Sequence, residues 1–151
     1  MSTLAELLRP QNIELDLAVA DKSALFVHLA ERGAPLSGVA QATVLDSLRE
    51  RENAGSTGLG MGVAIPHGRL KGLRGGVVLF SRLATPIDFD SPDGKPVSLV
   101  FTLLVPANAE DLHLQLLGEL AQNLGSSAFR QRLAEAADPA SVLSAFATSE
   151  A

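Results

Sequence analysis

Apolar residues recur at the three- and four-residue spacing of amphipathic helices in several segments of the chain. The clearest stripe, Leu116, Leu117, Leu120 and Leu124, lies on one side of a helix that we expect over 112–124. Two further helices are expected over 3–8 and 128–136. Three more are expected to begin after an N-cap: one follows Asp21 and ends at Gly33, one follows Ser37 and runs to 52, and one follows Asp138. Asp and Ser suit these starts because their side-chain oxygens accept hydrogen bonds from the first free helix amides.

Other segments show the alternation or the continuous apolar runs of β-strands. We expect strands at 12–17, 63–65, 76–83 and 97–105. The last of these, VSLVFTLLV, is rich in β-forming residues and nearly all apolar, which is typical of a central strand covered on both faces. Because helices and strands interleave, we predict the α/β class. No internal repeat or linker is visible, so we expect one domain over residues 1–151.

A glycine-rich segment, GSTGLGMG at 55–62, precedes the expected strand at 63–65. It holds too much Gly for a regular element, so we expect a loop that delivers the chain to Pro66, His67 and Gly68. Gly68 would let the chain turn with positive φ and let a ligand approach the backbone. His67 is therefore a candidate for chemistry, although its position alone slightly favours an idle histidine in a surface turn.

Composition limits the side chains that can act. The 151 residues include no Cys, Trp or Tyr, which excludes disulfides, thiolate metal sites and a Cys nucleophile, and argues against aromatic stacking on bases or sugars. The 12 Lys and Arg against 17 Asp and Glu give a net charge of −5. No basic run offsets this charge, so we expect no nucleic-acid partner. Chemistry must come from His, carboxylates, hydroxyls and Arg.

The distribution of apolar residues also bears on location. No apolar stretch approaches the ~20 residues that cross a bilayer, and the first ten residues lack the pattern of a signal peptide. The lack of Cys fits a reducing compartment. We therefore expect a cytoplasmic protein without membrane insertion.

Several polar groups around the glycine-rich segment could hold an anion. Ser56 and Thr57 offer hydroxyls, and Arg51 ends the preceding helix with a fork of donors suited to phosphate. The segment is not a Walker A sequence, because no Gly-Lys-Ser/Thr follows, and it lacks the third Gly of GxGxxG. Nucleotide binding is therefore weakly supported.

The two remaining histidines differ in position. His113 lies near the start of the helix over 112–124 and follows the apolar strand, and strand ends of α/β sheets are where sites collect. An isolated histidine on the apolar side of a helix is more often a hydrogen-bonded core residue. His28 lies inside an early helix beside Leu25 and Leu29, and we assign it no role.

These residues permit two kinds of chemistry. A neutral imidazole could attack phosphorus and become a phosphohistidine, with an arginine and backbone amides stabilising the charge on the oxygens. Alternatively, His67, His113 and a carboxylate such as Asp111 could bind a metal, but no HExxH or similar close pair is present. The metal hypothesis is the weaker one, and we expect no metal and no other cofactor.

Three segments carry a family resemblance: RENAGSTGLGMGVAIPHGRL at 51–70, TPIDFDSPDGKPVSLVFTLLVPA at 85–107 and DLHLQLLGELA at 111–121. They resemble, in order and spacing, the enzyme IIA domains of the fructose and mannitol class in the bacterial phosphotransferase system (PTS EIIA type-2). The Ser-Thr-Gly followed by Ile-Pro-His-Gly is highly specific for that family's phosphorylation site. The resemblance covers essentially the whole chain and implies a mixed, mainly parallel sheet with helices on both sides.

The resemblance also implies site residues. His67 matches the histidine that accepts the phosphoryl group on Nε2, His113 matches the second active-site histidine, and Arg51 matches the arginine near the phosphoryl site. Ser56, Thr57 and Gly68 fall in the phosphoryl-site loop. The chain would then be a phosphotransferase component that acts without a metal.

Among the subtypes, the stand-alone length and the segments around Ser56 and Thr85 are most similar to the nitrogen-regulatory enzyme IIA. This subtype implies an HPr-like carrier of the NPr type as donor, and target proteins such as transporters or sensor kinases. The alternatives are a sugar-transport enzyme IIA that passes phosphate to a fructose- or mannitol-type IIB component, and a metal-independent binding module without phosphotransfer. Met61 stands where relatives often carry Asn or Glu, so it bears on partner choice.

Overall fold

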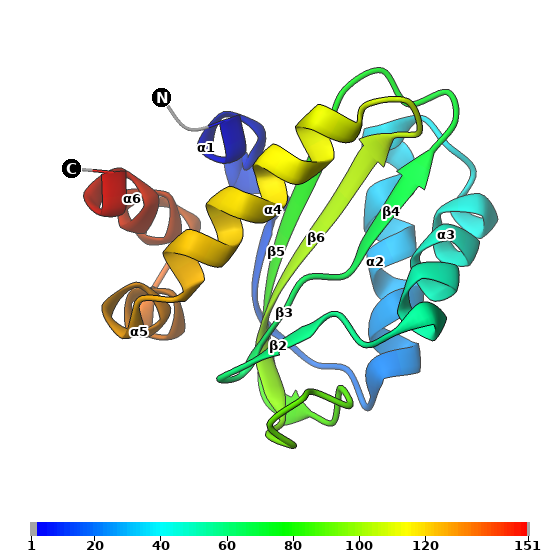
Figure 1. Cartoon of the computed structure of the whole chain (residues 1–151). Helices are drawn as coiled ribbons and strands as arrows, with labels where there is room; N and C mark the ends of the chain where they lie inside the picture. Colours follow the sequence, from blue (N-terminus) through cyan, green and yellow to red (C-terminus); the bar gives the residue numbers. More distant parts are fainter. Residues whose placement is uncertain (1–2, 151) are drawn as a thin grey trace.

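The strands of the protein form one mixed sheet in the computed structural model, which describes residues 3–150 (Figure 1). They are β1 (Ile13–Leu17), β2 (Gly58–Gly60), β3 (Val63–Ala64), β4 (His67–Leu70), β5 (Val77–Ile87) and β6 (Val97–Pro106). Their order is β1-β5-β6-β3-β2, and β4 pairs with β6 beside this path. The β1–β5, β3–β6 and β4–β6 pairs are parallel, and the β5–β6 and β2–β3 pairs are antiparallel. The mixed, mainly parallel sheet is thus confirmed.

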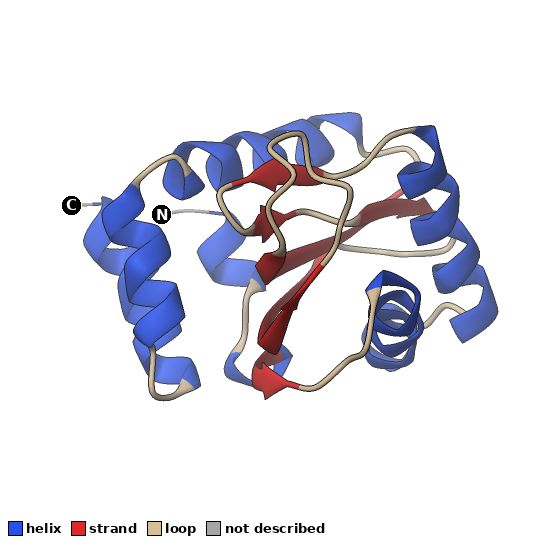
Figure 2. Cartoon of the chain, turned by 90° about the horizontal axis from the view of Figure 1, so that it is seen from below, coloured by secondary structure: helices blue, strands red, loops and turns tan. Residues whose placement is uncertain are grey.

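Helices cover both faces of this sheet, as Figure 2 shows in a view from below. On one face lie α2 (Lys22–Ser37) and α3 (Gln41–Ala54), and across the other runs α4 (Glu110–Leu124). Three shorter helices lie on the same side as α4: α1 (Thr3–Leu7), α5 (Ser127–Glu135) and α6 (Pro139–Glu150). A 3-10 turn, Pro10–Asn12, leads into β1. The interleaving of helices and strands confirms the α/β class.

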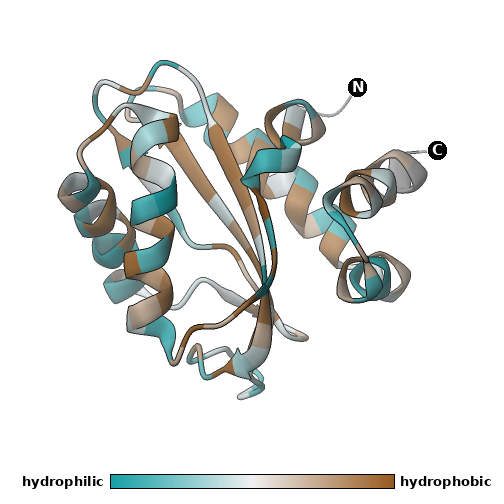
Figure 3. Cartoon of the chain, turned by 180° about the vertical axis from the view of Figure 1, so that it is seen from behind, coloured by the Kyte–Doolittle hydropathy of each residue, from teal (hydrophilic) through white to brown (hydrophobic). Residues whose placement is uncertain are grey.

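The core is built around β6. Its residues 99–105 are all buried, because helices lie above and below the strand. One apolar cluster joins β5 and β6 to the helices on the α4 side and includes Phe101 and Phe146, while a second cluster joins them to α2 and α3 and includes Leu29 and Leu104. The hydropathy colouring of Figure 3 shows these long strands as largely hydrophobic. The expectation of a central strand covered on both faces is confirmed.

The end of α2 differs from the expectation. The helix does not stop at Gly33 but continues through Pro35 to Ser37, and Gly38, with φ of 73°, ends it. A Cβ atom at Gly33 would lie 2.8 Å from Cδ1 of Leu104, so this glycine allows α2 to pack closely on β6 rather than ending the helix. The Ser37 hydroxyl donates to the carbonyl of Ala34, and the expectation that Ser37 caps the next helix is wrong.

The glycine-rich segment at 55–62 also differs from the expected loop, because residues 58–60 form the short strand β2. The turn that follows places Met61 at φ of 57° between two glycines that also have positive φ. The amide of Met61 donates to Oδ2 of Asp93 at 2.8 Å, which stabilises this conformation. The expectation of a loop without a regular element is therefore wrong for 58–60 and holds for the turn.

Strand β4 was not expected, and the remaining helices and strands lie close to their expected bounds. Asp21 accepts a hydrogen bond from the amide of Ala24, and Asp138 accepts one from the amide of Ser141, as N-caps do. Strand β5 extends beyond the expected 76–83 as far as Ile87. Across residues 3–150, no helix has both the length and the apolar character needed to cross a membrane.

Candidate active site

His67 begins strand β4 and is held rigidly by the sheet. Its Cα pairs with that of Leu103 in β6, and the carbonyl of Pro66 accepts a hydrogen bond from the amide of Leu103. The His67 side chain is largely buried, with the residue 8% exposed. The histidine is therefore part of a strand, not of the surface turn that its position along the chain favoured.

Two partners define the protonation of the His67 ring. Nδ1 lies 2.8 Å from the carbonyl oxygen of Ile65, which can only accept, so Nδ1 carries the hydrogen. Nε2 lies 3.1 Å from Nε of Arg51, whose N–H can only donate, so Nε2 carries the lone pair. The ring is therefore a neutral imidazole with its lone pair on Nε2.

The surroundings of His67 favour this neutral form. Burial lowers the pKa of the imidazole below its usual value of about 6.5, and the positive charge of Arg51 lowers the pKa further. The hydrogen bond to Ile65 acts in the opposite direction without reversing the net shift. Near neutral pH the ring therefore keeps a free electron pair, which is what a nucleophile requires.

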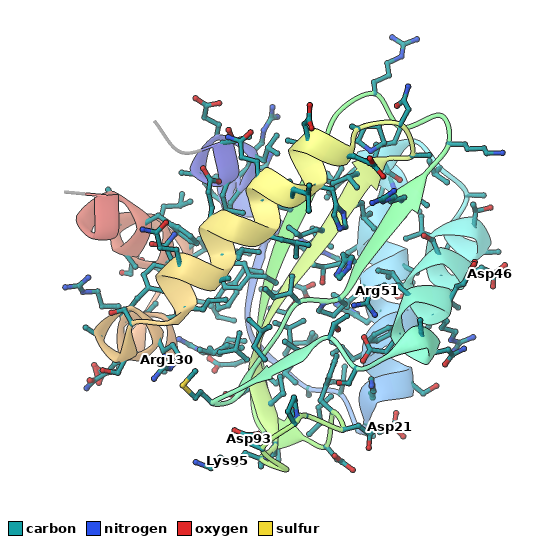
Figure 4. The ribbon with its side chains drawn as sticks, viewed as in Figure 1. Asp21, Asp46, Arg51, Asp93, Lys95 and Arg130 are labelled. Carbon is teal, nitrogen blue, oxygen red and sulfur yellow. The ribbon has the colours of Figure 1, made fainter. Side chains whose placement is uncertain are left out.

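Arg51 reaches the histidine from the last turn of α3. Its Nη1 donates to the carbonyl of Gly55 at 2.8 Å while its Nε donates to His67. Figure 4 shows the labelled Arg51 between α3 and β4. The hydrogen bond to Gly55 anchors one end of the guanidinium at the end of the helix, so the other end is directed at the ring.

His113 lies against His67 from the first turn of α4. The two ring centroids are 5.0 Å apart with an angle of 63° between the planes. Burial is the main cause of a lowered pKa of His113, and the charge of His67 when protonated and the charges of Arg69 and Arg51 lower the pKa further. Nδ1 of His113 is buried without a hydrogen-bond partner among the described residues, so this ring retains hydrogen-bonding capacity.

A cavity of about 440 Å³ joins these groups. It is lined by Ser47, Glu50, Arg51, Ala54, His67, Gly68, Arg69 and His113. The structure therefore brings together the two histidines and the arginine singled out from the sequence. It adds Arg69, which the sequence reasoning missed, although its position two residues after His67 on a strand places it on the same side.

Gly68 has a different role from the one expected. It lies inside β4 and its φ is not positive. A Cβ atom at this position would collide with the hydroxyl oxygen of Ser47. Gly68 therefore lets β4 pack closely on α3, and the expectation of a positive-φ turn is wrong.

The hydroxyls of Ser56 and Thr57 are used inside the protein. Ser56 donates to the carbonyl of Phe89 at 2.8 Å, and Thr57 donates through its hydroxyl and its amide to the carboxylate of Glu52. Lys22 completes the network, with Nζ 2.7 Å from Oε2 of Glu52. Both loop residues flank His67 in a smaller cavity of about 230 Å³, but their hydroxyl hydrogens point to these internal acceptors.

Two other sequence candidates lie outside this arrangement. Nε2 of His28 lies 2.8 Å from Oε1 of Glu14 on the edge strand β1, and Nε of Arg32 lies 3.1 Å from the same oxygen. Asp111 belongs to no group of three or more His, Cys, Asp or Glu side chains that could hold a metal ion within residues 3–150. The metal-site hypothesis of His67, His113 and Asp111 thus gains no support from the geometry.

Comparison with known proteins gives consistent matches. The sequence model of the family described as "Phosphoenolpyruvate-dependent sugar phosphotransferase system, EIIA 2" matches residues 6–149. A nitrogen regulatory protein from Bradyrhizobium diazoefficiens is 39% identical over 144 residues, which cover 95% of this chain and 94% of that protein. The fructose-specific EIIA component of the PTS system in Haloferax volcanii is 44% identical over 92 residues, which cover about three fifths of either chain.

A solved structure extends the likeness to three dimensions. The crystal structure of the nitrogen regulatory protein IIA-Ntr from Neisseria meningitidis superposes with a TM-score of 0.93 at 41% identity. The match covers 96% of this chain and 99% of that one. The arrangement of sheet and helices described above is therefore shared with that protein along nearly the whole chain.

Proposed function

Because the chain belongs to the EIIA type-2 family of the phosphoenolpyruvate-dependent sugar phosphotransferase system, we propose that it is a regulatory phosphocarrier whose His67 accepts a phosphoryl group. The donor is an HPr-like carrier of the NPr type that is itself phosphorylated on histidine. The phosphorylated and unphosphorylated forms bind target proteins differently. The observation that carries this proposal is the tautomer of His67, with its lone pair on Nε2 inside a cavity bordered by two arginines.

The proposed step is a displacement at phosphorus. The lone pair on Nε2 of His67 attacks, the P–Nε2 bond forms, and the N–P bond of the donor's phosphohistidine breaks. The electron pair of that bond returns to the donor's ring nitrogen. The donor leaves as a neutral imidazole because its other nitrogen keeps its proton, and His67 keeps its Nδ1 proton on the carbonyl of Ile65. No proton therefore leaves either ring.

Arg51 and His113 support the transfer electrostatically. Charge spreads over the phosphoryl oxygens in the transition state, so fixed donors around them lower the barrier. As phosphorus approaches Nε2, the N–H of Arg51 moves from the ring nitrogen to a phosphoryl oxygen, a shift that its anchor on Gly55 allows. The ring of His113, whose centroid lies 5.0 Å from that of His67, donates a hydrogen bond that orients His67 or another phosphoryl oxygen.

The surface around the site supports a regulatory readout. Leu59 (44% exposed) lines the smaller cavity with His67, Leu114 (65% exposed) follows His113 on α4, and Met61 (53% exposed) lies in the turn after β2. Phosphorylation of His67 places negative charge on the phosphoryl oxygens at Nε2. A partner that contacts these apolar side chains beside the histidines would bury that charge, so its affinity depends on phosphorylation. The similarity to nitrogen regulatory proteins supports this role.

The test is incubation with phosphoenolpyruvate, enzyme I and an NPr-type carrier, followed by intact mass measurement. We expect an acid-labile gain of one phosphoryl group that is lost in His67→Ala. His28→Gln is the matched control, because His28 lies outside the cavity, and it should label as the wild type does. No gain by a correctly folded wild type would contradict the proposal and favour a binding module without phosphotransfer.

The sugar-transport alternative is separated by one further step. The fructose-specific relative gives it a basis. When the labelled protein is mixed with a fructose-type IIB component, the regulatory role predicts that the phosphoryl group stays on His67. Transfer to IIB at a rate comparable with uptake from the carrier would instead identify a sugar-transport component.

A further inference from the structure

Arg69 is the second guanidinium that lines the cavity, and the transfer steps proposed above assign it no role. It stands on β4 two residues after His67, and side chains at this spacing point to the same side of a strand. It lines the cavity together with Arg51 and His113. Its positive charge contributes to the lowered pKa of both imidazoles, which places that charge within electrostatic reach of both.

The backbone of Arg69 is held from two sides. Its Cα pairs with that of Val105 in β6, and its carbonyl accepts a hydrogen bond of 3.2 Å from the hydroxyl of Ser47 on α3. The start of the side chain is therefore fixed relative to His67. Only the long, flexible part of the side chain can change its partner.

The present partner of Arg69 is weak. Its Nη1 lies 3.3 Å from Oε1 of Glu110, and the two side chains are 44% and 72% exposed. Exposed ion pairs of this kind contribute little to stability. Arg51, in contrast, already directs Nε to His67 and Nη1 to Gly55. Arg69 thus has more donors available for a new anion than Arg51 has.

We propose that Arg69 is a phosphoryl-binding residue that releases Glu110 and binds the phosphoryl oxygens once His67 is phosphorylated. The inference rests on the proposed phosphorylation of His67. A phosphoryl group offers three acceptor oxygens that carry negative charge, compared with the two oxygens of the Glu110 carboxylate. Arginine's planar fork matches such oxygens in pairs. Glu110 competes with the phosphoryl group for Arg69 and disfavours the phosphorylated state.

The test must separate contact with the phosphoryl group from contact with a partner's surface. Phosphoramidate can phosphorylate histidine without a carrier protein, so labelling with it does not depend on the docking of a carrier on this chain. The ³¹P resonance of the isolated phosphoprotein is then followed as a function of pH. Nearby positive charge lowers the pKa of the phosphohistidine that the ³¹P titration reports (the phosphoryl pKa), so Arg69→Gln should raise that pKa by about one unit. Arg69→Lys, which keeps the charge and loses the fork, should give a smaller rise.

Matched controls use the same charge change elsewhere. Arg74→Gln removes an exposed arginine of the turn after β4 that does not line the cavity, and should leave the phosphoryl pKa unchanged. Glu110→Gln frees Arg69 and should raise the phosphorylated fraction at equilibrium with the carrier by about threefold or more, while Arg69→Gln should lower it comparably.

The outcomes distinguish the two proposals. Equal phosphoryl pKa values in Arg69→Gln and Arg74→Gln, with the wild type labelled on His67, would overturn the role of Arg69 and leave the proposed function intact. A wild type that is labelled by phosphoramidate but not by the carrier would overturn the proposed function, while the titration still decides on Arg69. A wild type that neither reagent labels would overturn both.

Discussion

Nε of Arg51 donates a hydrogen bond of 3.1 Å to Nε2 of His67, the ring nitrogen that carries the lone pair. The arginine therefore occupies the position that phosphorus must reach. It also stabilises the neutral ring, because its charge lowers the pKa of the imidazole. The guanidinium thus adds to the effect of burial in keeping the nucleophile unprotonated before the reaction and can bind the phosphoryl oxygens during it.

Arg51→Gln should slow phosphorylation of His67 by about 100-fold, the scale on which loss of one oxyanion donor acts. The pKa of His67 should rise only part of the way toward its ordinary value, because burial, the main cause of the lowering, remains after the Arg51 charge is removed. Initial labelling rates and histidine NMR titration measure the two effects. Arg49→Gln, an exposed arginine of the same helix outside the main cavity, is the control. An unchanged rate in Arg51→Gln would contradict the role of this residue.

Stability should fall as the pH is lowered through the range of the histidines. The folded-state pKa values of His67 and His113 lie below the unfolded value of about 6.5. Between these values the unfolded chain binds more protons, so the free energy of unfolding decreases as pH falls through this window. Urea unfolding at pH 7.5 and 5.5 should show a larger loss in the wild type than in His67→Gln. Equal losses would show that burial of His67 has no such effect.

The close approach of β4 to α3 predicts a steric effect at Gly68. Gly68→Ala should lower the free energy of unfolding by about 1–3 kcal/mol, because the added methyl group meets the Ser47 hydroxyl. Ser47→Ala should recover part of this loss in the double variant. Gly75→Ala, where a Cβ would meet no atom within 4 Å, should be nearly neutral. A cost at Gly68 no larger than at Gly75 would contradict the packing described here.

Glu52 is the buried acceptor that holds the loop before β2. Its side chain is 7% exposed, lies 2.7 Å from Nζ of Lys22 and accepts from Thr57. Glu52→Gln should lower the free energy of unfolding by about 2 kcal/mol, because the charge paired with Lys22 is lost. Glu31→Gln on the exposed side of α2 should cost little. Denaturant unfolding of both variants provides the comparison, and equal costs would argue against this network.

The alternation of helices and strands was predictable from the spacing of apolar residues. The apolar run at 97–105 is the buried strand β6, and Asp21 caps α2. Gly33 misled the prediction, because a glycine that permits close packing and a glycine that ends a helix look the same in one sequence. Only the position of Leu104 across the interface distinguishes them.

The candidate site was predictable in part. The positions of His67, Arg51 and His113 along the chain made them candidates, the resemblance implied their roles, and the fold brings all three to one cavity. Arg69 was missed because its relevance depends on the strand that places it beside His67. The partners of Ser56 and Thr57 were equally hidden, since Phe89 and Glu52 approach them only in the folded chain.

The central claim concerns one atom, Nε2 of His67. Two-bond ¹H–¹⁵N correlation spectra of the histidine rings, recorded near neutral pH before and after phosphorylation, test it most directly. We predict a neutral ring with hydrogen on Nδ1 and an unprotonated Nε2 before the reaction, and phosphorus coupled to Nε2 afterwards. Hydrogen on Nε2 beforehand, or phosphorus on Nδ1 or on another residue afterwards, would contradict the account.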